Sequence, residues 1–283
     1  MLITLKEILK IAEENKTAIG AFNAPNLESL EAILGAAEEL NLPVILQAAQ
    51  AHEELIPLEI IGPIMIKKAK EANVPICVHL DHGETLEYLE IALKMGFTSI
   101  MFDGSLLSFE ENVKNTLKAV NMAREFGASV EAELGSMGKR ESGIGDGGGL
   151  KIYTDPIKAK EFVLQTGIDA LACSFGTTHG IYLTEPKLDF RVVEKVRRET
   201  GGIPVVMHGG SGVSDEDFRS AIKAGVRKIN YFTYMDKAGG AAAREYIAKI
   251  EEGRPIFYTE IIKASTKEMK ENVKNAMSIF AMH

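Results

Sequence analysis

Short apolar runs alternate along the chain with longer segments in which apolar residues recur at helical spacing. Runs of this kind, bounded by glycine, polar or aspartate-bearing turns, predict buried β-strands. Three of them open with proline, which is tolerated at the first position of a strand. Eight strands are expected, over residues 18–22, 43–46, 75–80, 99–102, 129–133, 170–173, 204–207 and 228–230.

The segments between these runs predict amphipathic helices, among them residues 27–41, 58–72, 109–126 and 190–200. Strict alternation of apolar strands with helices is typical of a parallel sheet covered by helices. Eight strand–helix units of roughly 30 residues each predict a closed (β/α)8 barrel, the TIM barrel. No linker or change in composition divides the chain, so residues 1–283 are expected to form a single barrel domain. Extra terminal helices are expected after Tyr258, where subunit contacts are common.

Composition narrows the class of protein. The formal net charge is -8 and no basic block occurs, which argues against nucleic acid or an acidic membrane as partner. No uncharged apolar run reaches the roughly 18 residues of a membrane-spanning helix. The N-terminal segment is amphipathic and does not resemble a secretory signal. Cys77 and Cys173 both lie inside apolar runs, so free buried thiols and a reducing cytoplasm are expected.

Three of the six histidines end an apolar run and are followed by glycine: His82, His179 and His208. A lone histidine at a strand end is usually structural, but three in the same setting predict a shared site. Three imidazoles with one open position form a catalytic zinc shell, and the neighbouring Asp81 would move a proton beside the metal. His79 is expected to be structural and is left out of the shell.

A glycine-rich segment, residues 134–153, follows the fifth expected strand. Irregular segments of this length are usually lids or disordered links. Residues 143–148 match the spelling GxGxxG, but they lie about ten residues from the strand and open no helix. A dinucleotide site requires strand, turn and helix in that order, so the match is rejected.

Two turns near the C-terminal end of the expected barrel predict a phosphate site. Residues 209–212 read Gly-Gly-Ser-Gly and run into Ser214, which would cap a helix with Asp217 completing a capping box. Residues 230–233 follow the eighth expected strand. Barrels usually hold phosphate after strands seven and eight, although a plain turn would account for either loop alone.

With these residues assembled, the chain resembles the class II, zinc-dependent ketose-bisphosphate aldolases, which act on fructose or tagatose bisphosphate. The resemblance extends to about Lys237. It rests on His-Leu-Asp-His at 79–82 and on residues 21–23, 101–105, 109–112, 130–135, 153–156, 176–180 and 208–212.

The resemblance implies roles for individual residues. Zinc would be held by His82, His179 and His208, with Glu133 as an alternative ligand. Asp81 would be the acid/base at the C4 hydroxyl, and Glu141, on the mobile loop, would exchange the proton next to the carbonyl. Asn23 matches a family asparagine in the loop after the first strand. The dihydroxyacetone phosphate half would be bound by Gly180, Gly209, Gly210, Ser211, Asn230, Tyr231, Phe232 and Thr233.

The reaction implied is reversible cleavage of a ketose bisphosphate to dihydroxyacetone phosphate and an aldehyde such as glyceraldehyde 3-phosphate. Zinc would polarise the carbonyl, and the glutamate on the lid would act after closure. A monovalent cation, Na+ or K+, and a homodimer or homotetramer are also implied.

Departures from the family pattern fall near the substrate. Charged residues replace glycine around Glu141, aromatic residues occupy positions 231, 232 and 234, and Ala49 stands where relatives often carry serine. Other substrates therefore stay open, including another phosphorylated keto sugar or a deoxy-keto acid. A metal-dependent isomerase or hydrolase, and a non-catalytic sugar-phosphate binding subunit, are the other readings.

Overall fold

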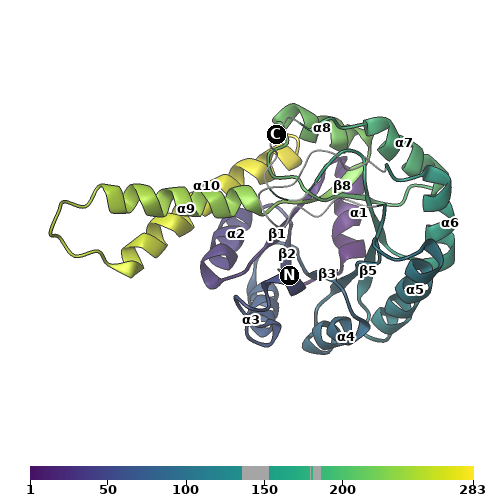
Figure 1. The fold of residues 1–283 in the computed structure, drawn as a ribbon, viewed down its shortest axis with the longest axis horizontal. Coiled ribbons are helices and arrows are strands. Elements are labelled where there is room, and N and C mark those ends of the chain that lie inside the picture. The colour runs from purple at the N-terminus through teal and green to yellow at the C-terminus, as the bar shows by residue number, and fades with distance from the viewer. Residues whose placement is uncertain (136–152, 179, 181–185) are drawn as a thin grey trace.

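The computed structural model describes residues 1–135, 153–178, 180 and 186–283. Its centre is a closed barrel of parallel strands that follow one another in chain order, as Figure 1 shows. The expected (β/α)8 barrel with extra helices is confirmed. The strands are β1 (Ile19–Asn23), β2 (Val44–Ala49), β3 (Ile76–Gly83), β4 (Ser99–Phe102), β5 (Ser129–Leu134), β6 (Ala170–Cys173), β7 (Val205–Met207) and β8 (Val226–Asn230).

Helices surround this barrel, and their ends follow local signals in the sequence. Thr4 and Glu7 form a reciprocal capping box at the first helix, and Asp155 caps the sixth with proline in its first turn. The helices are α1 (Leu5–Asn15), α2 (Leu27–Leu40), α3 (Leu58–Glu71), α4 (Leu86–Met95), α5 (Phe109–Glu125), α6 (Pro156–Thr166), α7 (Phe190–Glu199), α8 (Asp215–Ala224), α9 (Thr233–Ala248) and α10 (Tyr258–Phe280), with a 3₁₀ turn, η1 (Gln50–His52).

The interior of the barrel changes from apolar to polar along its axis. At the amino ends of the strands, inward side chains such as Ile45, Cys77 and Val206 pack with α1, which closes this end. Side chains two residues further along a strand point to the same face. Here they are polar and buried: Gln47, His79 and His208. Polar side chains are therefore gathered at the carboxyl ends of the strands, where barrel enzymes have their active sites.

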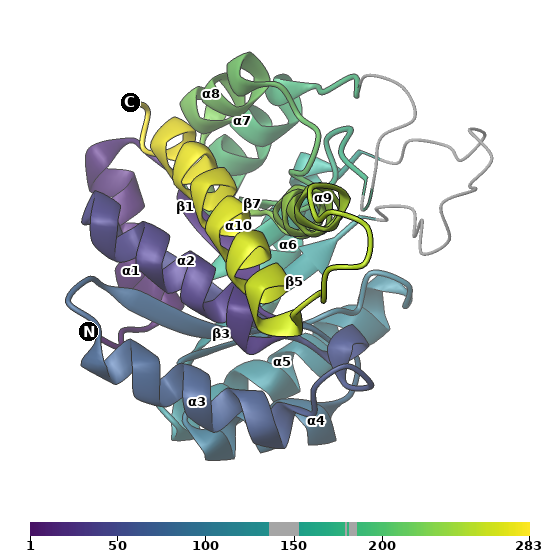
Figure 2. The same ribbon diagram turned by 90° about the vertical axis from the view of Figure 1, so that its left-hand side faces the viewer.

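The last two helices, α9 and α10, form a hairpin that projects from the barrel (Figure 1). Near the barrel, α10 packs between α2 and α9, which Figure 2 shows from the side. The N-terminal residues of α10 lie far from the barrel. None of the helices in the described part of the chain combines the length and apolar character needed to cross a membrane.

Candidate active site

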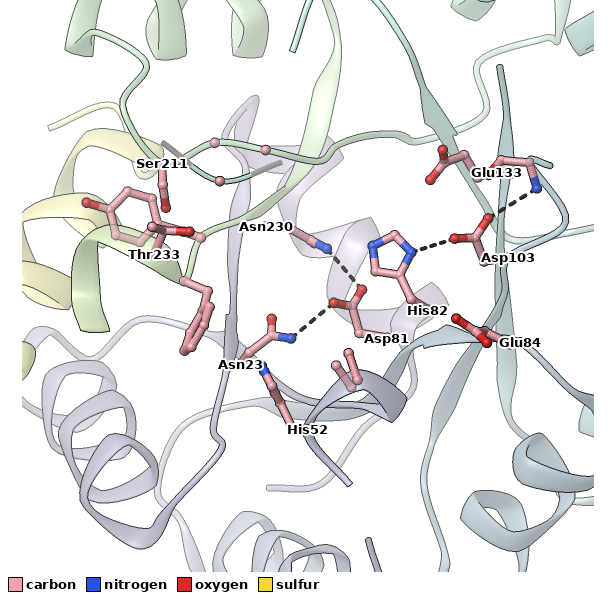
Figure 3. A pocket seen from close by; sticks show the side chains of 18 of the residues that line it. Asn23, His52, Asp81, His82, Glu84, Asp103, Glu133, Ser211, Asn230 and Thr233 are labelled. Carbon is pink, nitrogen blue, oxygen red and sulfur yellow. Dashed lines mark hydrogen bonds and ion pairs between the residues drawn. The ribbon is translucent and has the colours of Figure 1, made fainter. Parts of the chain in front are cut away.

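A cavity of about 310 Å³ opens at the carboxyl ends of the strands (Figure 3). It is lined by residues from loops that are far apart in the sequence. All the residues expected to bind substrate are in its wall: Asn23, Gly180, Gly209, Gly210, Ser211, Asn230, Tyr231, Phe232 and Thr233. Asp81, His82 and Glu133 line the same cavity.

Asp81 and His82 are neighbours in β3, yet both face the cavity. In a regular strand adjacent side chains point to opposite faces. The register of β3 against β4 shifts between Leu80 and Gly83, and His82 has a φ angle of 48°. Such a bulge re-aims a side chain, and positive φ at a non-glycine residue is a strained state often found at functional sites. The bulge also carries β3 beyond residue 80, where the sequence pattern predicted its end.

Asp81 is a buried carboxylate held by two amides. Its Oδ2 accepts a hydrogen bond from Asn23 Nδ2 (3.2 Å), and its Oδ1 accepts one from Asn230 Nδ2 (3.0 Å). Burial alone would raise the pKa of Asp81, but the positive charges of His82 and Lys228 outweigh this and hold the pKa well below its usual range. Asp81 is therefore an oriented, ionised group that can accept a proton.

His82 is oriented by a carboxylate on the next strand's loop. Its Nδ1 lies 2.8 Å from Asp103 Oδ2, and the other Asp103 oxygen accepts a hydrogen bond from the Ser105 backbone (3.1 Å). Metal-ligating histidines usually donate their second ring nitrogen to a carboxylate in this way. The same arrangement fixes which nitrogen faces the cavity.

His208 shows the same pattern in the barrel interior. Its Nε2 lies 2.9 Å from Glu131 Oε1, and its Nδ1 lies 3.6 Å from Glu133 Oε2. The His82 and His208 rings meet edge to face, with centroids 4.7 Å apart. The two neighbouring imidazoles are therefore each hydrogen-bonded to a carboxylate, His82 to Asp103 and His208 to Glu131.

The donor atoms of these side chains fit a divalent metal ion. Asp81, His82 and His208 each offer one ligand atom within 4.8 Å of the others, and so do His82, Asp103 and Glu133. Burial and the negative charge of Asp103 raise the pKa of Glu133 to about 8, despite the opposing charge of His82. Nitrogen and carboxylate donors of this kind suit zinc.

Two expected site residues cannot be placed. His179, the third expected zinc ligand, and Glu141, the expected loop glutamate, both lie outside the described residues, as does most of the glycine-rich segment. His79, by contrast, is fully buried, and its Nδ1 lies 2.8 Å from Ser99 Oγ. It belongs to neither of the two ligand groups found among the described residues.

The two expected phosphate loops lead into α8 and α9, and the N-termini of these helices are capped differently. Ser214 caps α8, because its Oγ accepts a hydrogen bond from the Asp217 amide (3.1 Å). The Asp217 carboxylate accepts a hydrogen bond from the Ser214 hydroxyl (2.9 Å) and not from the Ser214 backbone, so the expected reciprocal capping box does not form. The N-cap residue of α9, Phe232, makes no side-chain cap hydrogen bond. Gly209 has φ 66°, and a Cβ there would lie 2.3 Å from the Thr178 carbonyl oxygen. At the start of α9, the Tyr234 amide instead donates a hydrogen bond to Ser211 Oγ (3.3 Å), which links the two loops.

The aromatic residues after β8 point in different directions. The Tyr231 ring packs in the core against Phe22 and Phe280, with centroids 5.9 and 6.2 Å away. The Phe232 ring contacts His52 (5.2 Å between centroids), which also lines the cavity. Tyr231 thus contributes its ring to the core, whereas the ring of Phe232 packs against another residue of the cavity wall.

Four residues of the site were not singled out from the sequence: His52, Asp103, Glu131 and Lys228. Asp103 and Glu131 lie in two of the stretches that carried the resemblance, residues 101–105 and 130–135, but neither was given a role. Lys228 gave no such signal, since a lysine in a short strand is usually solvated.

Comparisons with known proteins agree with this geometry. Residues 3–283 match the family model described as fructose-bisphosphate aldolase class-II. The chain is 44% identical over 252 residues to a fructose-bisphosphate aldolase of Geobacillus stearothermophilus, covering 88% of this chain and 86% of that one. A Staphylococcus aureus protein of the same name is 41% identical over 258 residues, covering 89% and 88%.

A crystal structure of the YdjI aldolase from Escherichia coli K12 superposes with a TM-score of 0.87 at 34% identity, covering 99% of this chain and 97% of that one. A structure of a putative fructose-1,6-biphosphate aldolase from Coccidioides immitis gives a TM-score of 0.84 at 28% identity, covering 98% and 95%. The chain belongs to the class II fructose-bisphosphate aldolase family.

Proposed function

We propose that this protein is a zinc-dependent aldolase that reversibly cleaves a ketose bisphosphate, in the first place fructose 1,6-bisphosphate or tagatose 1,6-bisphosphate. The products would be dihydroxyacetone phosphate and an aldehyde such as glyceraldehyde 3-phosphate. The observation that carries the proposal is the position of Asp81 beside two carboxylate-oriented histidines, His82 in the cavity wall and the fully buried His208. A non-catalytic sugar-phosphate binding subunit would not need this arrangement.

His82 and His208 would hold the metal ion together with His179, and Glu133 would be an alternative ligand. When bound, the ion supplies a Lewis acid that polarises the substrate carbonyl. Asp103 and Glu131 would keep the two histidine rings in the ligating orientation, because each accepts a hydrogen bond from the ring nitrogen that does not face the ion.

Asp81 would take the proton from the C4 hydroxyl as the bond between C3 and C4 breaks. Its two amide partners, Asn23 and Asn230, keep the carboxylate charged and aimed into the cavity. Glu141 would then protonate the three-carbon fragment at C3. A general acid or base of this kind contributes about 10²- to 10⁴-fold to a rate.

The phosphate of the three-carbon half would bind at the start of α9, near Ser211 and Thr233. Backbone amides at a helix N-terminus bind anions without a cationic side chain. A monovalent cation near this phosphate is implied by the family, and cleavage assays in Na+, in K+ and in neither test it.

A second candidate is a ketose phosphate whose far end carries hydroxyl groups in place of a phosphate. None of the described residues that line the cavity is lysine or arginine. The wall holds His52 instead, whose pKa is lowered by burial and whose buried Nδ1 has no hydrogen-bond partner among the described residues. A neutral imidazole suits a hydroxyl group better than a phosphate.

The test is aldol cleavage of a panel that contains both bisphosphates and ketose 1-phosphates of increasing length, with and without a chelator. Chelator-sensitive release of dihydroxyacetone phosphate supports the proposal and names the substrate. Asp81→Ala is expected to retain zinc and lose about 10²- to 10⁴-fold in kcat, whereas His208→Ala is expected to lose zinc. A wild-type protein that binds zinc but cleaves no member would contradict the proposal.

We also propose that the protein is a homodimer or homotetramer. The outer part of the α9–α10 hairpin carries exposed apolar side chains, among them Ile256 (52% exposed), Phe257 (60%) and Tyr258 (73%). Gathered apolar side chains on a projecting element are typical of a protein interface. Symmetric self-association would cover two such hairpins at once.

A further inference from the structure

Lys228 is a fully buried lysine that the proposed reaction does not use. It lies on β8, where its Nζ forms an ion pair with Glu131 Oε2 (2.8 Å) and donates a hydrogen bond to Asn230 Oδ1 (2.8 Å). A buried ion pair is weak evidence for stability, because apolar residues of similar volume often serve as well or better. The presence of this charge in the barrel interior therefore calls for a reason beyond folding.

Asn230 is the first group that Lys228 orients. A carboxamide can present either its oxygen or its NH2 group to a neighbour, but a lysine can only donate. The contact with Lys228 therefore requires the Asn230 oxygen and turns the NH2 group toward Asp81, where Nδ2 donates to Oδ1 (3.0 Å). The reverse orientation would set an amide oxygen against a carboxylate. Lys228 thus decides that Asn230 supports the charge of Asp81.

Glu131 is the second group. One of its oxygens forms an ion pair with Lys228, and the other lies 2.9 Å from His208 Nε2. A carboxylate in this position takes the N–H of the ring, so the lone pair of His208 is on Nδ1, the nitrogen nearer Glu133. Lys228 compensates the charge of Glu131 and keeps it available as an acceptor.

We propose that Lys228 is a positioning residue that orients Asp81 through Asn230 and His208 through Glu131 at the same time. The inference rests on the proposed function, which assigns Asp81 as the acid/base and His208 as a metal ligand. One buried ammonium group would then link the proton-transfer side of the site to its metal side. Lys228 itself touches neither substrate nor metal in this arrangement.

A purely structural ion pair predicts a different response to mutation. If Lys228 and Glu131 serve folding alone, removing both charges together restores a normal site. If they position the site, the double variant folds, but Asn230 is free to turn over and a glutamine at 131 can offer either end to His208. The two readings are separated by Lys228→Met/Glu131→Gln, which also covers the case in which Lys228→Met alone fails to fold.

A matched control lies on the same strand. Arg227 points out of the barrel, is nearly buried, and pairs with Glu13 (Nε–Oε2 3.0 Å), away from the cavity. Arg227→Met/Glu13→Gln removes an ion pair that involves the same strand, together with the contact between Glu13 and Arg197, without touching Asn230 or His208. This control is expected to change thermal stability and leave the site unaltered.

The experiment measures Co²⁺ affinity by chelator competition, without substrate, and then kcat and KM for the substrate cleaved by the wild type. For the double variant we expect about a 10- to 100-fold loss in both Co²⁺ affinity and kcat, with little change in KM. Retention of either Co²⁺ affinity or kcat within about threefold of wild type, or an equal loss in the control, overturns the proposal. If the wild type cleaves nothing, the proposed function fails, while Co²⁺ affinity still decides whether Lys228 positions His208.

Discussion

At the scale of single residues, the site balances charges that are almost out of contact with water. Asp81, Glu131 and Glu133 lie close together with His82, His208 and Lys228 in the upper part of the barrel. Each charge shifts the ionisation of its neighbours because the interior screens them poorly. The pKa values of Glu133 and His82 show this most clearly, and they lead to a test on the metal-free protein.

We predict that the metal-free protein loses stability as the pH rises from about 6 to 9. Burial and the charge of Asp103 raise the Glu133 pKa from 4.5 to about 8, and the charge of Asp81 outweighs burial to raise the His82 pKa from 6.5 to about 9. In this window the folded chain holds protons that the unfolded chain has released, so the free energy of unfolding falls with pH. At about 1.4 kcal/mol per pKa unit, the loss is on the order of a few kcal/mol.

Thermal unfolding with a chelator at several pH values measures this loss. Glu133→Gln is the control, since its slope with pH should be clearly smaller. Added zinc should reverse the trend, because metal ligands must be deprotonated to bind. A melting temperature that rises with pH in the metal-free wild type would show that the carboxyl and imidazole do not hold these protons.

At the scale of elements, the bulge at the end of β3 decides whether Asp81 and His82 can act together. Gly83 follows His82, and a Cβ at this position would lie 2.3 Å from Leu89 Cδ2 and 2.9 Å from the Met101 carbonyl oxygen. The backbone of β4 cannot move away without breaking its pairing with β3. Glycine therefore lets the bulge lie close against the next strand.

Gly83→Ala is expected to destabilise the protein by about 1–3 kcal/mol and to weaken zinc binding, because the bulge must shift. Gly240→Ala on α9 is the matched control: a Cβ there meets no atom within 4 Å, and alanine in a helix should be neutral or stabilising by about 1 kcal/mol. Denaturant unfolding and zinc titration of both variants make the comparison. Normal zinc affinity in Gly83→Ala would mean that the bulge tolerates the extra atom.

Most helices and strands could be predicted from the sequence, but this bulge could not. The apolar run predicted a strand up to residue 80, because Asp81, His82 and Gly83 look like a turn. Their pairing with β4 depends on residues about twenty positions away, which local patterns do not show. The same limit applies to Lys228, whose partner Glu131 lies on β5, about one hundred positions earlier in the sequence.

At the scale of the whole molecule, the order of strands follows directly from the alternation in the sequence, since parallel barrels connect neighbours through helices. The sequence also predicted extra helices after Tyr258. It did not predict that α10 would begin far from the barrel and return along α9, because amphipathic patterns give no direction in space (Figure 1). In a monomer, the apolar side chains at the end of this hairpin would stay exposed to water.

We predict that Phe257→Ser/Tyr258→Ser converts the oligomer to smaller species without changing the barrel. Both side chains are more than half exposed in the single chain, and burying each against a second copy would contribute about 1.5 kcal/mol or more. Because a symmetric contact buries two copies of each side chain, losing them should raise the dissociation constant about 10⁴-fold. Leu164→Ser on α6, where the side chain is 76% exposed, is the control and should leave association unchanged. Sedimentation velocity over a range of concentrations measures the effect. An oligomer of unchanged affinity in the double variant would place the subunit contact on another face of the molecule.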